Sequence, residues 1–379
     1  MASTTFCRSV PSSLRLTFTA SGVFCLPNLP LCSSRGLQRN ASVFAKQGRV
    51  LVVSDSGSSV SSNNDRRHVI VTGGNSGIGK STALELARQG FDVTLVCRNG
   101  KAGQNAAEDI ARLTNNESIR SMVCDLASLD SIRQFAAEYK DTGLPLNALV
   151  NNAGIMACPQ SYTGDGFETQ LGVNHLGHFL LTALLMDKLI SSASDGVQSR
   201  VVVLSSAAHM LGDIDFSDLN YKSRAYSNWG AYGQSKLANC LFSLELAKRC
   251  KQLGLPVISN SMHPGIVDTN LIRYVFPQGM RKEGAPVWPF EMPLRSLVMK
   301  VLGLKTADEG ASTAIFLASS PRVRSSGLYY VDSKEAVPSS KARDERLASR
   351  LWDVSVELTK SADVLAPLGL CKEGALITK

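Results

Sequence analysis

From residue 66 onward, short apolar runs alternate with longer stretches in which apolar residues recur every three or four positions. The runs include HVIVT, DVTLVC, NALVNN and RVVVLSS, and the stretches between them include IGKSTALELARQG, GQNAAEDIARL and SIRQFAAEYK. Strands that alternate with helices predict a parallel sheet with helices on both faces. The pattern therefore predicts an α/β fold over residues 66–335, a single Rossmann-type doubly wound domain with about seven strands.

The two ends of the chain lack this alternation. Residues 1–54 contain no Asp or Glu but six basic residues, and they are rich in Ser and Thr without a compact apolar run. This composition predicts a chloroplast transit peptide over residues 1–47, with a disordered tail as the alternative. We expect a flexible linker over residues 48–65, and a C-terminal helix and tail over residues 336–379.

Most of the net positive charge of the chain lies in this leader. The net charge is +8 over 379 residues, and removing the six leader charges leaves +2 for the rest. A nucleic-acid-binding domain carries its positive charge on the folded part, so we expect no nucleic-acid partner. The nine cysteines show neither C-x-x-C pairs nor histidines at zinc spacing, so we expect no metal site.

The first predicted turn, VTGGNSGIGKS, matches two phosphate-binding motifs. Residues 74–81 form a Walker A string, which would indicate a nucleoside triphosphatase. Gly73, Gly77 and Gly79 instead match a dinucleotide-binding turn, and both motifs direct backbone N–H groups at a phosphate. The strand RVVVLSS ends without the carboxylate that holds Mg²⁺ in a triphosphatase, although Asp125 after MVC keeps that alternative open.

The end of the second predicted strand bears on the choice of dinucleotide. In Rossmann folds, the residue that reads the adenosine ribose lies ~20 residues beyond the glycines. Arg98 stands there, after TLVC. A guanidinium pairs with the 2′-phosphate of NADP, whereas a carboxylate accepts from the free 2′-hydroxyl of NAD. We therefore expect NADP(H) as the cofactor.

A Tyr-x-x-x-Lys pair provides candidate acid–base chemistry. Tyr232 and Lys236 are four residues apart on a predicted helix, so their side chains share one face. Tyr330 and Lys334 repeat the spacing at the end of the predicted last strand, where no helix holds the pair. We take the second pair as a chance match.

Five motifs in register resemble the short-chain dehydrogenase/reductase family. They are the TGGNSGIG turn, NNAG at 151–154, a serine pair at 205–206 that closes a strand, the Tyr232/Lys236 pair, and Pro264-Gly265. Within the family, NHLGHFLL and HPGIVDTNL are most similar to retinol-dehydrogenase-like reductases and their chloroplast relatives. The segments CDLASLDSIRQF and LASRLWDVSVELTK also resemble protochlorophyllide oxidoreductase, but Ala238 stands where that enzyme has a cysteine.

The resemblance implies a role for each matching residue. It implies that Ser206 holds the substrate oxygen, that Tyr232 is the general acid/base, that Lys236 stabilises its phenolate, and that Asn174 organises a proton relay. We expect Ser205 to be structural, because neighbouring strand residues point to opposite faces. The residues expected to bind the cofactor are Gly73, Asn75, Ser76, Gly77, Ile78, Gly79, Arg98, Asp125, Leu126, Asn152, Ala153, Gly154, Tyr232, Lys236, Pro264, Gly265, Val267 and Thr269.

The substrate side of the site is expected after Pro264-Gly265. Residues 270–304 combine irregular Pro and Gly with large apolar residues, which predicts a lid over a lipophilic substrate. The basic and apolar stretch PLRSLVMKVLGLKT within this segment also suits peripheral contact with a membrane. By resemblance, a homo-oligomer is expected.

These observations predict a plastid NADPH-dependent oxidoreductase that acts on a lipophilic carbonyl or alcohol. Two alternatives remain at this point. One is reduction of a tetrapyrrole, and the other is NADPH sensing as a partner of a chloroplast membrane complex. The presence of both Tyr232 and Lys236 favours catalysis, because a sensor needs only the glycine turn.

Overall fold

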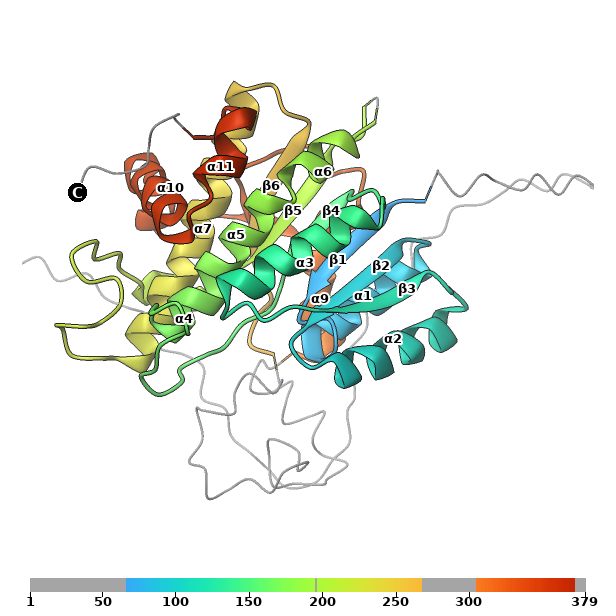
Figure 1. Ribbon diagram of the computed structural model, residues 1–379, viewed down its shortest axis with the longest axis horizontal. Helices are drawn as coiled ribbons and strands as arrows, with labels where there is room; N and C mark the ends of the chain where they lie inside the picture. Colours follow the sequence, from blue (N-terminus) through green and yellow to red (C-terminus); the bar gives the residue numbers. More distant parts are fainter. Residues whose placement is uncertain (1–65, 195, 268–304, 372–379) are drawn as a thin grey trace, which may run out of the picture. The chain divides into compact units, whose positions relative to one another are not determined.

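The computed structural model describes residues 66–194, 196–267 and 305–371. The predicted leader, the linker, the lid over residues 270–304 and Thr269 lie outside the described residues. The described residues form an eight-stranded sheet with helices on both faces (Figure 1), which confirms the predicted Rossmann-type α/β fold.

The strand order is β3-β2-β1-β4-β5-β6-β7-β8. The strands are β1 His68–Thr72, β2 Asp92–Cys97, β3 Ile119–Val123, β4 Ala148–Asn151, β5 Ser199–Leu204, β6 Val257–His263, β7 Tyr329–Val331 and β8 Lys334–Ala336. The first seven run parallel, and the sequence order reverses between β1 and β4. In doubly wound sheets, ligands bind beyond the carboxyl ends of the strands at such a reversal.

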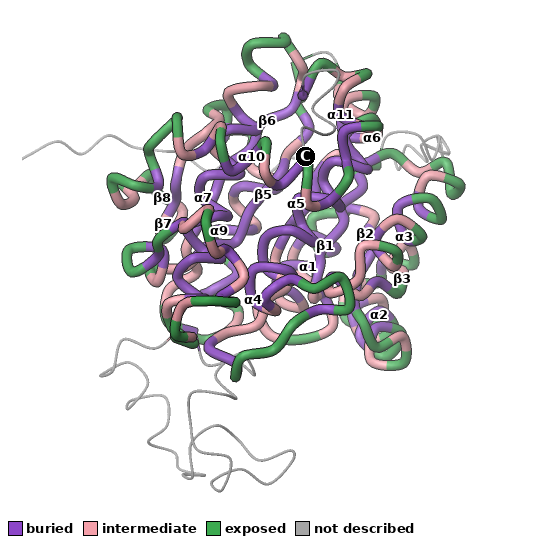
Figure 2. The backbone as a smooth tube through the Cα atoms, turned by 60° about the vertical axis from the view of Figure 1, so that its left-hand side comes forward, coloured by how far each residue is buried: buried purple, intermediate pink, exposed green. Residues whose placement is uncertain are grey.

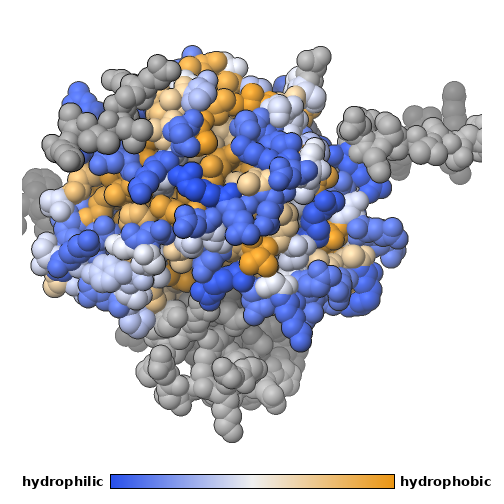
Figure 3. Space-filling view, viewed as in Figure 1, coloured by the Kyte–Doolittle hydropathy of each residue, from blue (hydrophilic) through white to orange (hydrophobic). Residues whose placement is uncertain are grey.

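Helices cover both faces of the sheet. They are α1 Gly77–Arg88, α2 Gly100–Thr114, α3 Leu129–Asp141, α4 Thr169–Leu171, α5 Gly177–Leu184, α6 Met186–Ser191, α7 Asn228–Gln252, α9 Ala307–Ser319, α10 Glu345–Thr359 and α11 Ala362–Leu365. One core joins the sheet to α1, α2 and α9, and the other joins it to α3, α5, α7 and α10. Figure 2 shows the buried strands between these layers, and Figure 3 shows hydrophilic residues over α2 and α3.

Alternation along the strands explains the two cores. On β1, Val69 and Val71 belong to the core under α1 and α9, whereas Ile70 belongs to the core under α3 and α5. Successive side chains of a strand point to opposite faces. All five residues of β1 are buried, so the strand reads as a continuous apolar run.

Side-chain caps mark the starts of several helices. Asn99 accepts a hydrogen bond from the N–H of Ala102 at the start of α2, and Ser128 caps α3 in the same way. At α9, Thr306 and Glu309 form a reciprocal capping box. Each cap satisfies N–H groups that have no partner within the helix.

The helical region between residues 169 and 191 is not one continuous α-helix. Residues Gly172–Leu176 form a π-helical segment between α4 and α5, and α6 starts afresh at Met186. A π segment inserts one residue into an α-helix and redirects the side chains beyond it. Asn174 lies within this segment.

The last two strands form a hairpin that the pattern did not predict. β7 and β8 pair antiparallel, and both central turn residues, Asp332 and Ser333, have positive φ. Tyr330 lies on β7 and Lys334 on β8, opposite Val331. The two residues of the second Tyr-x-x-x-Lys match therefore lie on different strands and not on one helix face. This agrees with its interpretation as a chance match.

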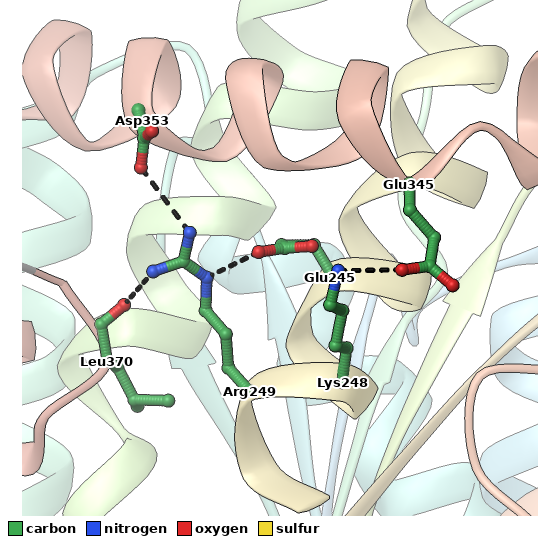
Figure 4. Close-up of polar contacts among 6 residues, drawn as sticks. All are labelled: Glu245, Lys248, Arg249, Glu345, Asp353 and Leu370. Carbon is green, nitrogen blue, oxygen red and sulfur yellow. Dashed lines mark hydrogen bonds and ion pairs between the residues drawn. The ribbon is translucent and has the colours of Figure 1, made fainter. Parts of the chain in front are cut away.

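The C-terminal helix α10 covers α7 and α5. Trp352 of α10 is 3% exposed, and its ring lies 5.0 Å from the ring of Phe179 on α5. Figure 4 shows the polar contacts beside this core: Arg249 of α7 bonds Glu245, Asp353 and the carbonyl of Leu370. The segment after the sheet is therefore an integral part of the core.

The described residues contain neither a helix suited to cross a membrane nor a cluster of metal-binding side chains. Within them, no helix is both long enough and apolar enough to span a bilayer. In the same residues, no three His, Cys, Asp or Glu side chains lie together as a metal site requires.

Replacing the indole that joins α10 to α5 and α7 tests this packing. We expect Trp352→Ala to lower the free energy of unfolding by about 3–5 kcal/mol, because it leaves a cavity in the core. Urea denaturation followed by far-UV circular dichroism measures the change. The control is Leu113→Ala, whose side chain is 51% exposed and whose effect should stay within about 0.5 kcal/mol. Equal effects of the two changes would contradict the packing.

Candidate active site

The glycine turn joins β1 to α1 with an exceptionally close backbone approach. A Cβ atom at Gly79 would lie 2.3 Å from the carbonyl oxygen of Gly73, so no larger residue fits. Ser76 occupies the N-cap of α1, is exposed, and makes no side-chain capping bond. The N-terminus of α1 is therefore free to offer its N–H groups and its positive dipole end to a phosphate.

The lysine of the Walker A string does not face this turn. Lys80 Nζ lies 2.9 Å from Asp109 Oδ2 on α2. In a triphosphatase, this lysine reaches the β- and γ-phosphates. Its pairing with α2 favours the dinucleotide interpretation of the turn.

A cleft of about 300 Å³ opens beside the turn, at the reversal of the strand order. Seven of the predicted cofactor residues line it: Gly73, Asn75, Arg98, Asp125, Leu126, Ala153 and Gly154. Cys97, Cys124, Ala127, Ile155, Cys158 and Val173 also line it, although the motifs did not indicate them. Ser76, Gly77, Ile78 and Gly79 belong to the adjacent start of α1.

Arg98 supplies positive charge to the cleft. It follows β2, is exposed, and forms no ion pair with the described residues. Asp125 follows β3, and its Oδ1 accepts a hydrogen bond from the N–H of Ala127. The two predicted adenosine-side residues therefore share one cleft, and neither forms an ion pair with another described residue.

The NNAG segment is held by the threonine at the end of β1. Thr72 Oγ1 accepts hydrogen bonds from the N–H groups of Asn152 and Ala153, each at 2.9 Å. Asn152 Nδ2 donates to the carbonyl of Thr72 at 2.7 Å. The Asn152 side chain is thus committed to the turn, and the backbone of Ala153 and Gly154 borders the cleft.

The predicted catalytic residues meet at the carboxyl end of β5. Tyr232 and Lys236 lie on α7 and are 3% and 4% exposed, and Ser206 follows β5. The Ser206 hydroxyl lies close enough to the phenol of Tyr232 to lower its pKa. Lys236 Nζ lies 5.7 Å from the centre of the Tyr232 ring and donates to the carbonyl of Leu204 at 3.1 Å.

The neighbouring residue, Ser205, makes its hydrogen bonds within the protein core. Ser205 Oγ donates to the backbone carbonyl of Lys236 at 2.7 Å and accepts from Cys240 Sγ. It therefore fastens α7 to the end of β5, which is the structural role expected for it.

Asn174 links the π segment to the loop after NNAG. Its Oδ1 accepts from the N–H of Ile155, and its Nδ2 donates to the Ile155 carbonyl and to Ser235 Oγ, each at 2.9 Å. A Cβ atom at Gly154 would lie 3.1 Å from Asn174 Oδ1 and 3.6 Å from Lys236 Nζ. Asn174 and Lys236 therefore both border Gly154.

The Pro264-Gly265 segment leads away from β6. Val267 forms an isolated bridge with Lys305, and a Cβ atom at Gly310 on α9 would press against the Val267 side chain. Pro264 and Gly265 are half-buried. These positions place the segment at the same edge of the sheet as Ser206, which follows the neighbouring strand β5.

Comparisons with known proteins fit this geometry. A family model described as short chain dehydrogenase matches residues 67–279. Retinol dehydrogenase 13 of Homo sapiens is 44% identical, over 76% of this chain and 83% of that protein. The chain belongs to the short-chain dehydrogenase family.

Other relatives agree with this assignment. Polyprenol dehydrogenase of Mus musculus is 42% identical over 77% of this chain and 84% of that protein. A solved structure of an uncharacterized protein from Mycobacterium paratuberculosis is 36% identical, with a TM-score of 0.60, over 78% and 93% of the two chains. The structure of Pseudomonas aeruginosa RhlG with NADP is 25% identical, with a TM-score of 0.52, over 74% and 96%. This short-chain dehydrogenase is an oxidoreductase most similar to retinol-dehydrogenase-like members.

Burial sets the protonation of Tyr232 and Lys236, the predicted catalytic pair of this short-chain dehydrogenase. It raises the pKa of Tyr232 to about 12, although the hydrogen bond from Ser206 lowers it in part. Burial also lowers the pKa of Lys236 to about 8. Burial dominates the pKa of the phenol in the protein alone, and the stabilisation of its phenolate by Lys236 stays a prediction. At neutral pH the phenol holds its proton.

The buried histidines serve as hydrogen-bonding groups. His178 bridges the carbonyl of Asn174 and the hydroxyl of Thr72, and His175 is hydrogen-bonded to Ser355 on α10. Burial lowers the pKa of both rings, to about 3 for His175 and about 4 for His178. The motifs did not reveal the link from Thr72 through His178 to Asn174, because its members come from separate elements.

The unpaired guanidinium in the cleft leads to a test of cofactor choice. We expect Arg98→Ala to weaken NADPH binding about 10- to 100-fold, as the loss of a charge-assisted hydrogen bond does, and to leave NADH binding nearly unchanged. Isothermal titration calorimetry with each nucleotide measures both constants. Arg112→Ala on α2 is the control, since that side chain is 70% exposed and lies outside the cleft. A parallel loss of NADPH and NADH affinity would contradict a role in 2′-phosphate recognition.

Proposed function

We propose that this short-chain dehydrogenase uses NADPH to reduce a lipophilic aldehyde or ketone, with Tyr232 as the proton donor. The observation that carries the proposal is the burial of Tyr232 and Lys236 next to Ser206, with Lys236 beside Gly154 of the cleft. Each residue has a separate task, and each task follows from a contact in the described residues.

The nucleotide site fits NADPH. The open N-terminus of α1 suits a pyrophosphate, and the unpaired Arg98 suits a 2′-phosphate on the adenosine ribose. The complex of RhlG with NADP, a protein of the same fold, supports this choice of nucleotide. When bound, the nicotinamide supplies the hydride.

The residues of the chain handle the proton. Ser206 lies close enough to Tyr232 to affect its pKa, so a substrate carbonyl oxygen placed between the two would accept hydrogen bonds from both hydroxyl groups. The raised pKa of Tyr232 keeps its proton in place at neutral pH, so the phenol is a donor, which suits reduction. Lys236, held by the Leu204 carbonyl, places positive charge near the phenolate left after the transfer.

Exposed apolar side chains lie on the two segments that carry this pair. Trp229 lies edge-on to Tyr232, with the ring centres 6.0 Å apart, and is 42% exposed. Met210 and Leu211, which follow Ser206 closely, are 63% and 73% exposed. An apolar approach to a polar pair favours a lipophilic substrate. The names retinol dehydrogenase and polyprenol dehydrogenase among the relatives support the same class.

Removal of one oxygen atom tests the proton donor. We expect Tyr232→Phe to reduce kcat about 10²- to 10⁴-fold, the usual contribution of general acid–base catalysis, while NADPH binds with unchanged affinity. NADPH oxidation with long-chain aldehydes and all-trans-retinal measures the rate. Tyr162→Phe is the control, because that side chain is 46% exposed and its hydroxyl bonds the backbone of Tyr221.

Three outcomes would contradict the proposal. Activity retained in Tyr232→Phe would remove Tyr232 as the donor. Turnover of a tetrapyrrole but of no aldehyde or ketone would favour tetrapyrrole reduction. Binding of NADPH without turnover of any carbonyl, together with full complementation by Tyr232→Phe in a plant lacking the protein, would favour a sensor.

We further propose that the protein acts in the plastid. The acid-free leader with its six basic residues supports this location. A fusion of residues 1–65 to a fluorescent protein should enter isolated chloroplasts and become a shorter, protease-protected product. The matched control replaces the six basic residues with Gln and should not enter. Uptake by mitochondria, or no uptake by either organelle, would contradict the proposal.

A further inference from the structure

His209 connects Ser206 to the C-terminal segment by hydrogen bonds. It lies on η2 (Ala207–Leu211), the short 3₁₀ helix that begins directly after Ser206, and is 1% exposed. Its Nδ1 lies 2.6 Å from the carbonyl oxygen of Ser206. Its Nε2 lies 3.1 Å from the backbone nitrogen of Ser339, which is 130 residues away in the sequence.

These two contacts determine where the ring carries its proton. The backbone N–H of Ser339 donates, so Nε2 must present a lone pair. Nδ1 therefore carries the hydrogen and donates it to the carbonyl of Ser206. Burial lowers the pKa of His209, which favours the neutral ring that this arrangement requires.

The carbonyl oxygen of Ser206 then accepts two hydrogen bonds, both from His209. It accepts from the ring of His209 at 2.6 Å and from the backbone N–H of His209 at 3.0 Å. The Ser206 hydroxyl in turn accepts from the N–H of Ala208 at 3.2 Å. Any rotation of the peptide after Ser206 would move both Ala208 and the hydroxyl that meets Tyr232.

The far side of the ring contacts β7 and the segment that follows β8. His209 stacks at a tilt against Tyr329 of β7, with the ring centres 5.1 Å apart. Ser339 precedes the short helix η5 (Lys341–Arg343), and its hydroxyl accepts from the N–H of Ala342. Lys341 pairs with Asp213 just beyond η2. The C-terminal segment thus contacts both η2 and the loop that follows it.

We propose that His209 is a positioning residue that orients the Ser206 hydroxyl and makes its geometry depend on the C-terminal segment at Ser339. The inference rests on the proposed function, because it acts through Ser206. It adds a requirement outside the glycine turn and the Tyr232/Lys236 pair: residues after the sheet help to build the reaction centre.

Two amide variants separate the two hydrogen bonds. In His209→Asn the amide nitrogen can take the place of Nδ1 and keep the bond to Ser206. In His209→Gln the amide oxygen can take the place of Nε2 and accept from Ser339, but the bond to Ser206 is lost. We expect kcat to fall at least about tenfold in His209→Gln and His209→Ala, and less than about threefold in His209→Asn, with unchanged affinity for NADPH.

The matched control is His68→Asn. His68 is also fully buried, and its Nε2 bonds Thr94 at the amino end of the sheet, away from Ser206. We expect this variant to lose stability without a change in kcat. Melting temperatures for all variants separate a loss of folding from a loss of rate, and rescue by His209→Asn distinguishes positioning from bulk packing.

The remaining outcomes decide the inference separately from the proposed function. Equal kcat values in wild type, His209→Gln and His209→Ala, with Tyr232→Phe inactive, would overturn only the role of His209. Activity in Tyr232→Phe would overturn the proposed function instead. Nitrogen-15 NMR of the histidine-labelled wild type tests the contacts without any assay: a neutral ring protonated at Nδ1 supports the inference, and a charged ring or an Nε2–H tautomer overturns it.

Discussion

A close backbone contact between α7 and η2 is the constraint on which the site depends. A Cβ atom at Gly212 would lie 2.3 Å from the carbonyl oxygen of Gly233, and one at Gly233 would lie 2.9 Å from that of Ala208. Any side chain at these positions would push η2 away from the helix. Because Ser206 directly precedes η2 and Tyr232 directly precedes Gly233, this contact brings the two hydroxyl groups together.

Because this contact is buried, it also shifts the pKa values of the side chains beside it. Tyr232 and Lys236 are almost completely buried, and burial disfavours the charged form of each group. Lys236 remains tolerable in the interior because the Leu204 carbonyl accepts its hydrogen bond. At neutral pH the phenol of Tyr232 therefore holds its proton, while Lys236 keeps most of its positive charge.

The C-terminal segment has two connected roles. Helix α10 closes the core over α5 and α7 through Trp352, and Arg249 reinforces the contact from α7. The residues just before α10 reach the opposite end of α7, where Ser339 meets His209. Packing and site geometry are thus coupled, because the same segment supports the helix that carries Tyr232 and the turn that carries Ser206.

Local spacing along the chain was enough to predict most of the sheet and the Tyr232/Lys236 pair, but not the β7–β8 hairpin or the π-helical segment. The alternation of apolar runs predicted the parallel strands, the glycines predicted a strand-to-helix turn, and four-residue spacing placed Tyr232 and Lys236 on one helix face. Tertiary structure alone decided the partner of Lys80, the direction of the pKa shift of Tyr232, and the hydrogen bond between His209 and Ser339. The physical reason is that the partners and the burial of a side chain depend on which distant segments of the chain pack together. The order of residues within one segment does not specify that packing.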